Sequence, residues 1–91
     1  MSKILHKTLL IGNTRGLHAR AAAKFVKCAE GFNASVIVTK DENNVSGTSI
    51  MGLMMLAASK GSSINVSVSG DDAEEALTAL ETLVGDKFGE D

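Results

Sequence analysis

Residues 16–21 read Gly16-Leu17-His18-Ala19-Arg20-Ala21, between an apolar run at 9–11 and a helical pattern at 22–26. His18 therefore falls at the first turn of a predicted helix, with Arg20 two residues later. A helix start has unpaired backbone N–H groups and the positive end of the helix dipole, which suit phosphate. His18 can carry a phosphoryl group there while amides and Arg20 hold its oxygens. On spacing alone, a capping histidine beside a solvated arginine explains the stretch equally well.

Size and composition narrow the class of protein. The chain has 91 residues, of which 44% are hydrophobic, and its net charge is -2. We expect one domain over 1–91, and the absence of a basic stripe or stacking aromatics argues against nucleic-acid binding. The single Cys28 excludes an internal disulfide and is expected to be a small buried apolar residue. We find no signal-peptide pattern or membrane-length apolar run, so a cytoplasmic protein is expected.

Hydrophobic periodicity predicts seven elements in the order strand, helix, strand, strand, helix, strand, helix. Their expected ranges are 3–11, 18–30, 34–39, 45–47, 50–58, 64–69 and a last helix that starts after Asp71. Asp71 with Glu74 resembles a capping box, and Lys60-Gly61 reads as a stop signal after the second helix. The tail over 85–91 reads as frayed and acidic, with Phe88 as the residue that can dock. This order predicts an α+β fold whose mainly antiparallel sheet carries helices on one face and meets water on the other.

The predicted second helix offers two further features. Ser49 precedes it as an N-cap, and a phosphate on that serine would change the surface more than the fold. The helix is apolar nearly all round, so Met51, Met54 and Met55 cannot all face inward. Methionines in such a helix most often fill the core. We nevertheless expect some of these three to stay on the surface, where they can contact a partner.

Other chemistries find little support in the sequence. It contains neither the G-x-S-x-G elbow of serine hydrolases nor the phosphate-binding loop of nucleotide-binding proteins. His6 lies in the first predicted strand without a nearby ligand cluster, and two histidines are too few for a metal site. We therefore expect no metal and no cofactor.

Gly16-Leu17-His18-Ala19-Arg20 resembles the phosphorylation motif of HPr, the histidine-containing phosphocarrier family of the bacterial phosphotransferase system. Ser49-Ile50-Met51-Gly52 resembles the family's regulatory serine motif, and the likeness runs along nearly the whole chain. It implies an open-faced β-sandwich, a four-stranded antiparallel sheet with three helices on one face. It also implies His18 as phosphoacceptor, Arg20 as the motif arginine and Ser49 as the serine modified by HPr kinase/phosphorylase. The chain departs from the family at Ala21, where proline is usual, and at Arg15, where many members have a small or amide residue.

The resemblance implies a phosphoryl carrier, not an enzyme, that takes phosphate from phospho-enzyme I and passes it to an enzyme IIA protein or domain. A monomer is expected, with a docking surface formed by Ile50, Met51 and Met54 beside Ala23. Two alternatives stay open. One is a carrier of the nitrogen-related regulatory branch, which the end Phe88-Gly89-Glu90-Asp91 faintly resembles. The other is an interaction module that transfers nothing.

Overall fold

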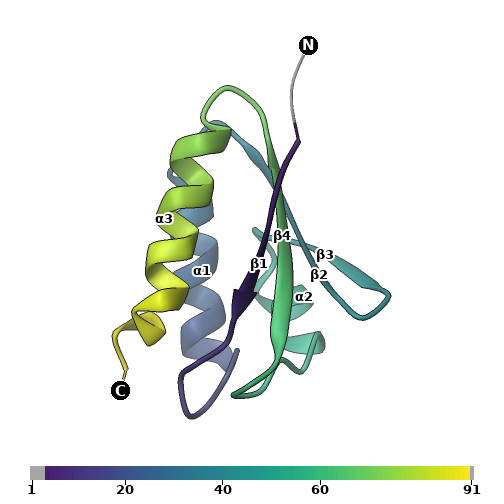
Figure 1. Cartoon of the computed structure of the whole chain (residues 1–91), viewed down its shortest axis with the longest axis vertical. Helices are drawn as coiled ribbons and strands as arrows, with labels where there is room; N and C mark the ends of the chain where they lie inside the picture. Colours follow the sequence, from purple (N-terminus) through teal and green to yellow (C-terminus); the bar gives the residue numbers. More distant parts are fainter. Residues whose placement is uncertain (1–3, 91) are drawn as a thin grey trace.

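The computed structural model describes residues 4–90. Its elements follow the predicted order, with one short 3-10 helix added at the end (Figure 1). They are β1 Leu5–Leu10, α1 Ala19–Glu30, β2 Ser35–Lys40, β3 Asn43–Ser46, α2 Ile50–Met55, β4 Ser63–Ser69, α3 Ala73–Gly85 and η1 Lys87–Gly89.

The four strands form one antiparallel sheet in the order β1-β4-β2-β3. The strand β4 lies between β1 and β2, with Val66 opposite Lys7 on one side and Val38 on the other. Helices α1 and α3 run antiparallel to each other beside the sheet, so the end of α3 lies near the start of α1 (Figure 1). The predicted α+β open-faced sandwich is confirmed.

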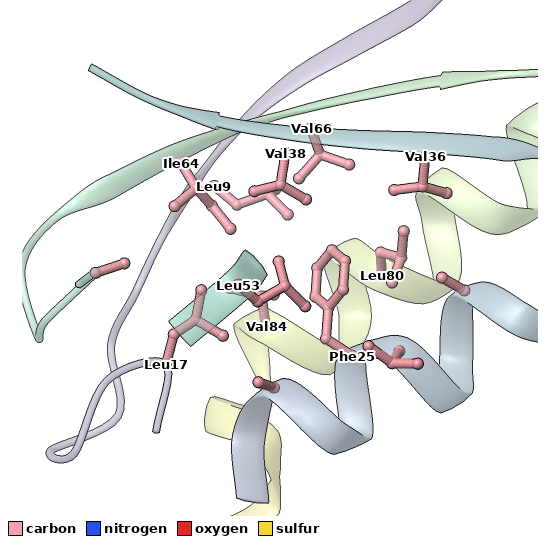
Figure 2. Packing of buried hydrophobic residues seen from close by; sticks show 14 of the residues in the cluster. Leu9, Leu17, Phe25, Val36, Val38, Leu53, Ile64, Val66, Leu80 and Val84 are labelled. Carbon is pink, nitrogen blue, oxygen red and sulfur yellow. The ribbon is translucent and has the colours of Figure 1, made fainter. Parts of the chain in front are cut away.

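The core lies between this sheet and the three α-helices. Phe25 of α1, Leu53 of α2 and Leu80 of α3 are fully buried and point toward Val38 and Val66 of the sheet (Figure 2). Burying each of these large side chains stabilises the fold by roughly 1.5–3 kcal/mol relative to exposure. The alternate residues of the strands form the open face, which is mostly polar and includes His6, Thr8, Asn65, Ser67 and the exposed Ile37.

Helix α2 ends at Met55, three residues earlier than expected. The Leu17 N–H donates to the Ala58 carbonyl at 2.9 Å, so residues 57–58 belong to a contact between two loops. Gly16 has φ +66°, and a Cβ there would lie 2.4 Å from the same carbonyl oxygen. Only glycine fits this close approach without displacing backbone. The loop after α2 is thereby tied to the residue that precedes His18.

The predicted cap of the last helix is wrong. The N-cap of α3 is Asp72, not Asp71, and its side chain makes no capping hydrogen bond. Both aspartates instead accept hydrogen bonds from Asn33: Asp72 Oδ2 from the backbone N–H at 2.7 Å, and Asp71 Oδ2 from Nδ2 at 3.1 Å. The carboxylates therefore join the α1–β2 loop to the start of α3, and the expected capping box with Glu74 does not form.

The hairpin and the tail also differ from expectation. The strand β3 begins at Asn43, because Asp41 adopts a left-handed φ of 56° and closes a tighter turn than predicted. The tail is ordered through Glu90: Phe88 is only 1% exposed and packs in the core. The prediction of a frayed tail is thus wrong for residues 85–90, and the prediction that Phe88 docks on the core is confirmed. Asp91 lies outside the described residues.

Candidate functional site

His18 is the N-cap residue of α1, but its side chain does not cap the helix. Its backbone is extended, with φ -73° and ψ 177°, and its carbonyl accepts the first helical hydrogen bond from the Ala22 N–H at 2.8 Å. The imidazole makes no capping bond and keeps 17% of its side-chain surface exposed. The alternative that His18 is a histidine whose side chain caps the helix is therefore wrong.

The imidazole of His18 instead contacts the tail of the chain. Its Nε2 lies 2.5 Å from Glu90 Oε2, and the other carboxylate oxygen, Oε1, accepts a hydrogen bond from Asn13 Nδ2 at 2.8 Å. Asn13 is fully buried, and the same Nδ2 donates to the Gly16 carbonyl at 2.8 Å. The loop before α1 and the end of the chain thus fix both oxygens of one carboxylate beside the histidine.

Glu90 is ionised near neutral pH. Burial by itself raises the pKa of its carboxyl, but the hydrogen bonds from Asn13 and His18 and the charges of His18 and Lys24 outweigh it and lower the pKa below its ordinary value. An ionised carboxylate only accepts hydrogen bonds, so the proton in the contact sits on His18 Nε2. In a neutral ring with its proton on Nε2, the lone pair lies on Nδ1.

Two shallow depressions flank this contact. One, of about 310 Å³, is lined by His18, Arg15, Met54, Ser59 and the apolar residues Leu17, Ala57 and Ala58. The other, of about 480 Å³, is lined by Thr14, Arg15, Arg20, Lys24, Gly89 and Glu90. Arg15 borders both. The predicted site arginine, Arg20, is exposed on the first turn of α1 and lies beside Glu90 in the second depression.

The second predicted feature, Ser49, is the N-cap of α2 as expected. Its Oγ accepts a hydrogen bond from the Gly52 N–H at 2.9 Å. Three of the predicted docking residues lie on α2 and are exposed: Ile50 to 40%, Met51 to 72% and Met54 to 43%. The fourth, Ala23 on α1, is half-buried. Met54 also lines the His18 depression, so the structure joins the exposed face of α2 to the candidate acceptor.

Two residues of the site were not predicted: Asn13 and Glu90. The sequence places Asn13 in a polar turn and Glu90 in an acidic tail, 72 residues beyond His18. One signal was available, namely Phe88, since a large apolar residue in a polar tail indicates that the tail packs on the core.

The remaining candidate residues lie away from the His18–Glu90 contact. His6 is exposed on the open sheet face, where its Nδ1 lies 2.9 Å from Ser67 Oγ. Cys28 is half-buried against the core, and burial raises the pKa of its thiol. Within residues 4–90, no cluster of three or more potential metal ligands occurs, and no helix has the length and apolarity needed to cross a membrane.

A partly exposed histidine beside a carboxylate and several cations, in shallow depressions on a small open-faced sandwich, fits a carrier of an anionic group better than an enzyme with a closed pocket. Comparison with known proteins identifies the family. Residues 5–86 match the family model of the HPr component phosphorylation site of the phosphotransferase system. The chain is 48% identical to phosphocarrier protein HPr of Neisseria meningitidis over 87 residues, covering 96% of this chain and 98% of the relative.

The structural comparison agrees. An HPr structure from Thermoanaerobacter tengcongensis superposes with a TM-score of 0.91 and 46% identity, covering 96% of this chain and 98% of that one. Phosphocarrier protein NPr of Shewanella violacea is 40% identical over 94% of each chain. The chain belongs to the HPr family and is a phosphocarrier of the phosphotransferase system, with enzyme I and enzyme IIA as the family's partners.

Proposed function

We propose that His18 takes the phosphoryl group from phospho-enzyme I and passes it to an enzyme IIA protein or domain. One observation carries this proposal: the His18 imidazole lies at the start of a helix, makes no capping hydrogen bond and lines an open depression. Neutral imidazole is populated near neutral pH and is a nucleophile. A shallow site suits a carrier, because donor and acceptor must both reach the same nitrogen.

Positive charge beside His18 supports the same assignment. Arg15 borders the depression that His18 lines, Arg20 borders the neighbouring one beside Glu90, and a guanidinium can hold phosphate oxygens through paired hydrogen bonds. The backbone N–H groups of the first turn of α1 add donors near the ring. Ala21, in place of the family's usual proline, adds one N–H and remains a good helix former, so function should be retained.

Labelling with phosphoenolpyruvate and enzyme I tests the acceptor. The wild-type protein and the His6→Ala variant should both take up acid-labile phosphate, whereas His18→Ala should take up none. His6 is a matched control, since it is the other histidine of the chain and lies on the opposite face of the sheet. Labelling that persists in His18→Ala contradicts the assignment. A wild-type protein that is never labelled would instead favour an interaction module.

The exposed face of α2 is our candidate for the surface that docks both partners. Met54 borders the His18 depression, and Ile50 and Met51 extend the apolar surface away from it. Donor and acceptor share this surface because each must reach His18, and we expect a monomer that exchanges partners. Ser49 then serves as a negative switch through HPr kinase/phosphorylase, because a phosphate there adds a dianion at the edge of an apolar surface.

A second candidate is the nitrogen-related regulatory branch. The similarity to an NPr protein favours it, as does the tail Phe88-Gly89-Glu90-Asp91. The two roles differ in the acceptor, not in the chemistry at His18. Mixing the phosphorylated protein with each enzyme IIA of the host separates them: rapid transfer to a sugar-specific enzyme IIA favours uptake, and selective transfer to the nitrogen-related enzyme IIA favours regulation.

A further inference from the structure

The end of the chain is held against the start of α1. Phe88 is 1% exposed, and its carbonyl accepts a hydrogen bond from Lys24 Nζ at 2.6 Å. Lys87, Phe88 and Gly89 have left-handed φ values of 55°, 56° and 71°, which turn the chain back from α3 toward α1. Two consecutive non-glycine residues in that conformation are unfavourable, and the burial of Phe88 offsets this cost.

This turn brings Glu90 to a defined place. Its side chain is 13% exposed, and its two oxygens have different partners, His18 Nε2 at 2.5 Å and Asn13 Nδ2 at 2.8 Å. Because Asn13 is buried and also bonded to the Gly16 carbonyl, the carboxylate has little freedom to rotate away from the ring. An anchored acceptor of this kind selects one tautomer and one rotation of a histidine.

We propose that Glu90 is a positioning residue for phosphoryl transfer: it holds His18 as the Nε2–H tautomer and directs the Nδ1 lone pair toward the phosphoryl donor. This inference rests on the proposed function of His18 as acceptor. The Nδ1 lone pair forms the new N–P bond, and the electron pair of the broken bond leaves with the donor. The Nε2 proton stays in place, so the phosphorylated ring is cationic and remains beside the Glu90 carboxylate. Transfer to the acceptor reverses these steps.

The charge of Glu90 could also act in the opposite direction, by repelling the incoming phosphoryl dianion. The three cations around it, Arg15, Arg20 and Lys24, offset that repulsion at short range. A positioning role and a repulsive role predict opposite changes in rate when Glu90 is removed. The experiment therefore decides between them.

The first measurement is the ¹⁵N spectrum of the imidazoles, which needs no partner protein. At a pH where the imidazoles are neutral, His18 of the wild type should show a protonated Nε2 and an unprotonated Nδ1. In Glu90→Ala, both shifts should move toward the average of the two tautomers, while the His6 signals stay unchanged. Glu75→Gln is the matched control, because it removes an exposed α3 carboxylate far along the helix from the tail.

The second measurement is the rate of labelling by phospho-enzyme I. The maximal rate for Glu90→Ala should fall by about tenfold or more, the scale on which a partner that orients a histidine acts. The KM for enzyme I should stay the same, since docking is untouched. Glu90→Gln should lie between Ala and wild type, because its amide oxygen can still accept from Nε2–H but its amide nitrogen faces Asn13 Nδ2. Glu75→Gln should match wild type.

The two hypotheses fail in different ways. A wild-type protein that is not labelled refutes the proposed function, whatever the tautomer. A labelled wild type with unchanged rate and unchanged imidazole shifts in Glu90→Ala and Glu90→Gln overturns the positioning role alone. Faster labelling of Glu90→Ala also overturns it, because Glu90 would then act as a brake.

Discussion

Helices α1 and α2 begin in opposite ways. The N-cap of α2, Ser49, uses its Oγ to accept a hydrogen bond from the Gly52 N–H. The N-cap of α1, His18, makes no such bond, and its imidazole contacts Glu90 instead. The Ser49 side chain therefore caps a backbone N–H of its own helix. The His18 side chain does not, so its imidazole and the N–H groups of the first turn of α1 stay available to other partners. The contrast separates a helix start that stabilises structure from one that is open to chemistry.

The largest expected effect is on transfer at the α1 start. His18→Ala should reduce labelling by phospho-enzyme I to background, because the nucleophile is gone. The helix itself should persist, since no side-chain capping bond is lost. Circular dichroism provides the measurement of helix content beside the labelling assay. A large loss of helix in His18→Ala would mean that this N-cap supports the fold after all, and the contrast with α2 would disappear.

The next effect is on the tail that completes the α1 start. Phe88→Ala should lower the free energy of unfolding by about 3–5 kcal/mol, because it empties a fully buried aromatic site. Urea unfolding measures the loss, and Phe32→Ala is the control, since Phe32 is only half-buried and should cost less. The tail should also loosen, which would shift the NMR signals of His18.

If Phe88→Ala does not fold, Phe88→Leu keeps part of the apolar contact and allows the same comparison. A loss below about 1 kcal/mol in Phe88→Ala would contradict an anchored tail. It would also weaken the argument for Glu90, whose place depends on the turn that Phe88 holds.

Arg20 should act on transfer and not on folding. Its side chain is exposed, so Arg20→Ala should change stability by no more than about 0.5 kcal/mol. Losing a charged hydrogen-bond donor to phosphate, worth roughly 1.5–3 kcal/mol, should slow transfer about 10–100-fold. Arg20→Lys should recover only part of the rate, because lysine cannot pair with two oxygens at once. Lys27→Ala, at another exposed cation of α1, is the control; a lower melting temperature with normal transfer would reverse the prediction.

The docking face of α2 should show a smaller effect that is shared by both partners. Met51→Glu adds a charge to the exposed apolar surface, and its desolvation on binding is unfavourable. We expect the affinity for enzyme I and for enzyme IIA to fall together, by about tenfold or more, which corresponds to at least ~1.4 kcal/mol. Ile37→Glu makes the same kind of change on the open sheet face and should leave both affinities intact. Chemical-shift mapping that places either partner on that face would contradict the model.

The sequence was sufficient for the features that local rules determine. Apolar and polar residues alternate along 64–69, which predicts a half-buried strand. The apolar residues of this segment, Ile64, Val66 and Val68, do form the core face of β4. Ser49 was correctly predicted as an N-cap because serine competes well for a helix's first amides. The fold class follows from the order of such elements.

Features that depend on distant partners were missed. Asp71 reads as a cap, but both it and Asp72 bond to Asn33, which is 38 and 39 residues away. The contact between His18 and Glu90 spans 72 residues, and no periodicity connects the two ends. Helix α2 likewise ends early, where Ala57 adopts a left-handed φ of 52° and the next carbonyl, of Ala58, accepts a hydrogen bond from the distant Leu17 N–H. Each of these places involves a tertiary hydrogen bond between segments far apart in the sequence, which a local pattern cannot show.

The smallest effect concerns the Ser49 cap. Ser49→Ala should lower the free energy of unfolding by about 1 kcal/mol, because the Gly52 N–H loses its acceptor, and it should transfer phosphate normally. Ser49→Asp keeps a capping oxygen and adds charge next to Ile50 and Met51, so the circular dichroism spectrum should stay native while labelling of His18 slows. Protein phosphorylated at Ser49 should be slower still, since it carries more charge. Equal labelling rates for phosphorylated and unmodified protein would reduce Ser49 to a structural cap. The α2 start would then differ from the α1 start in having no part in transfer at all.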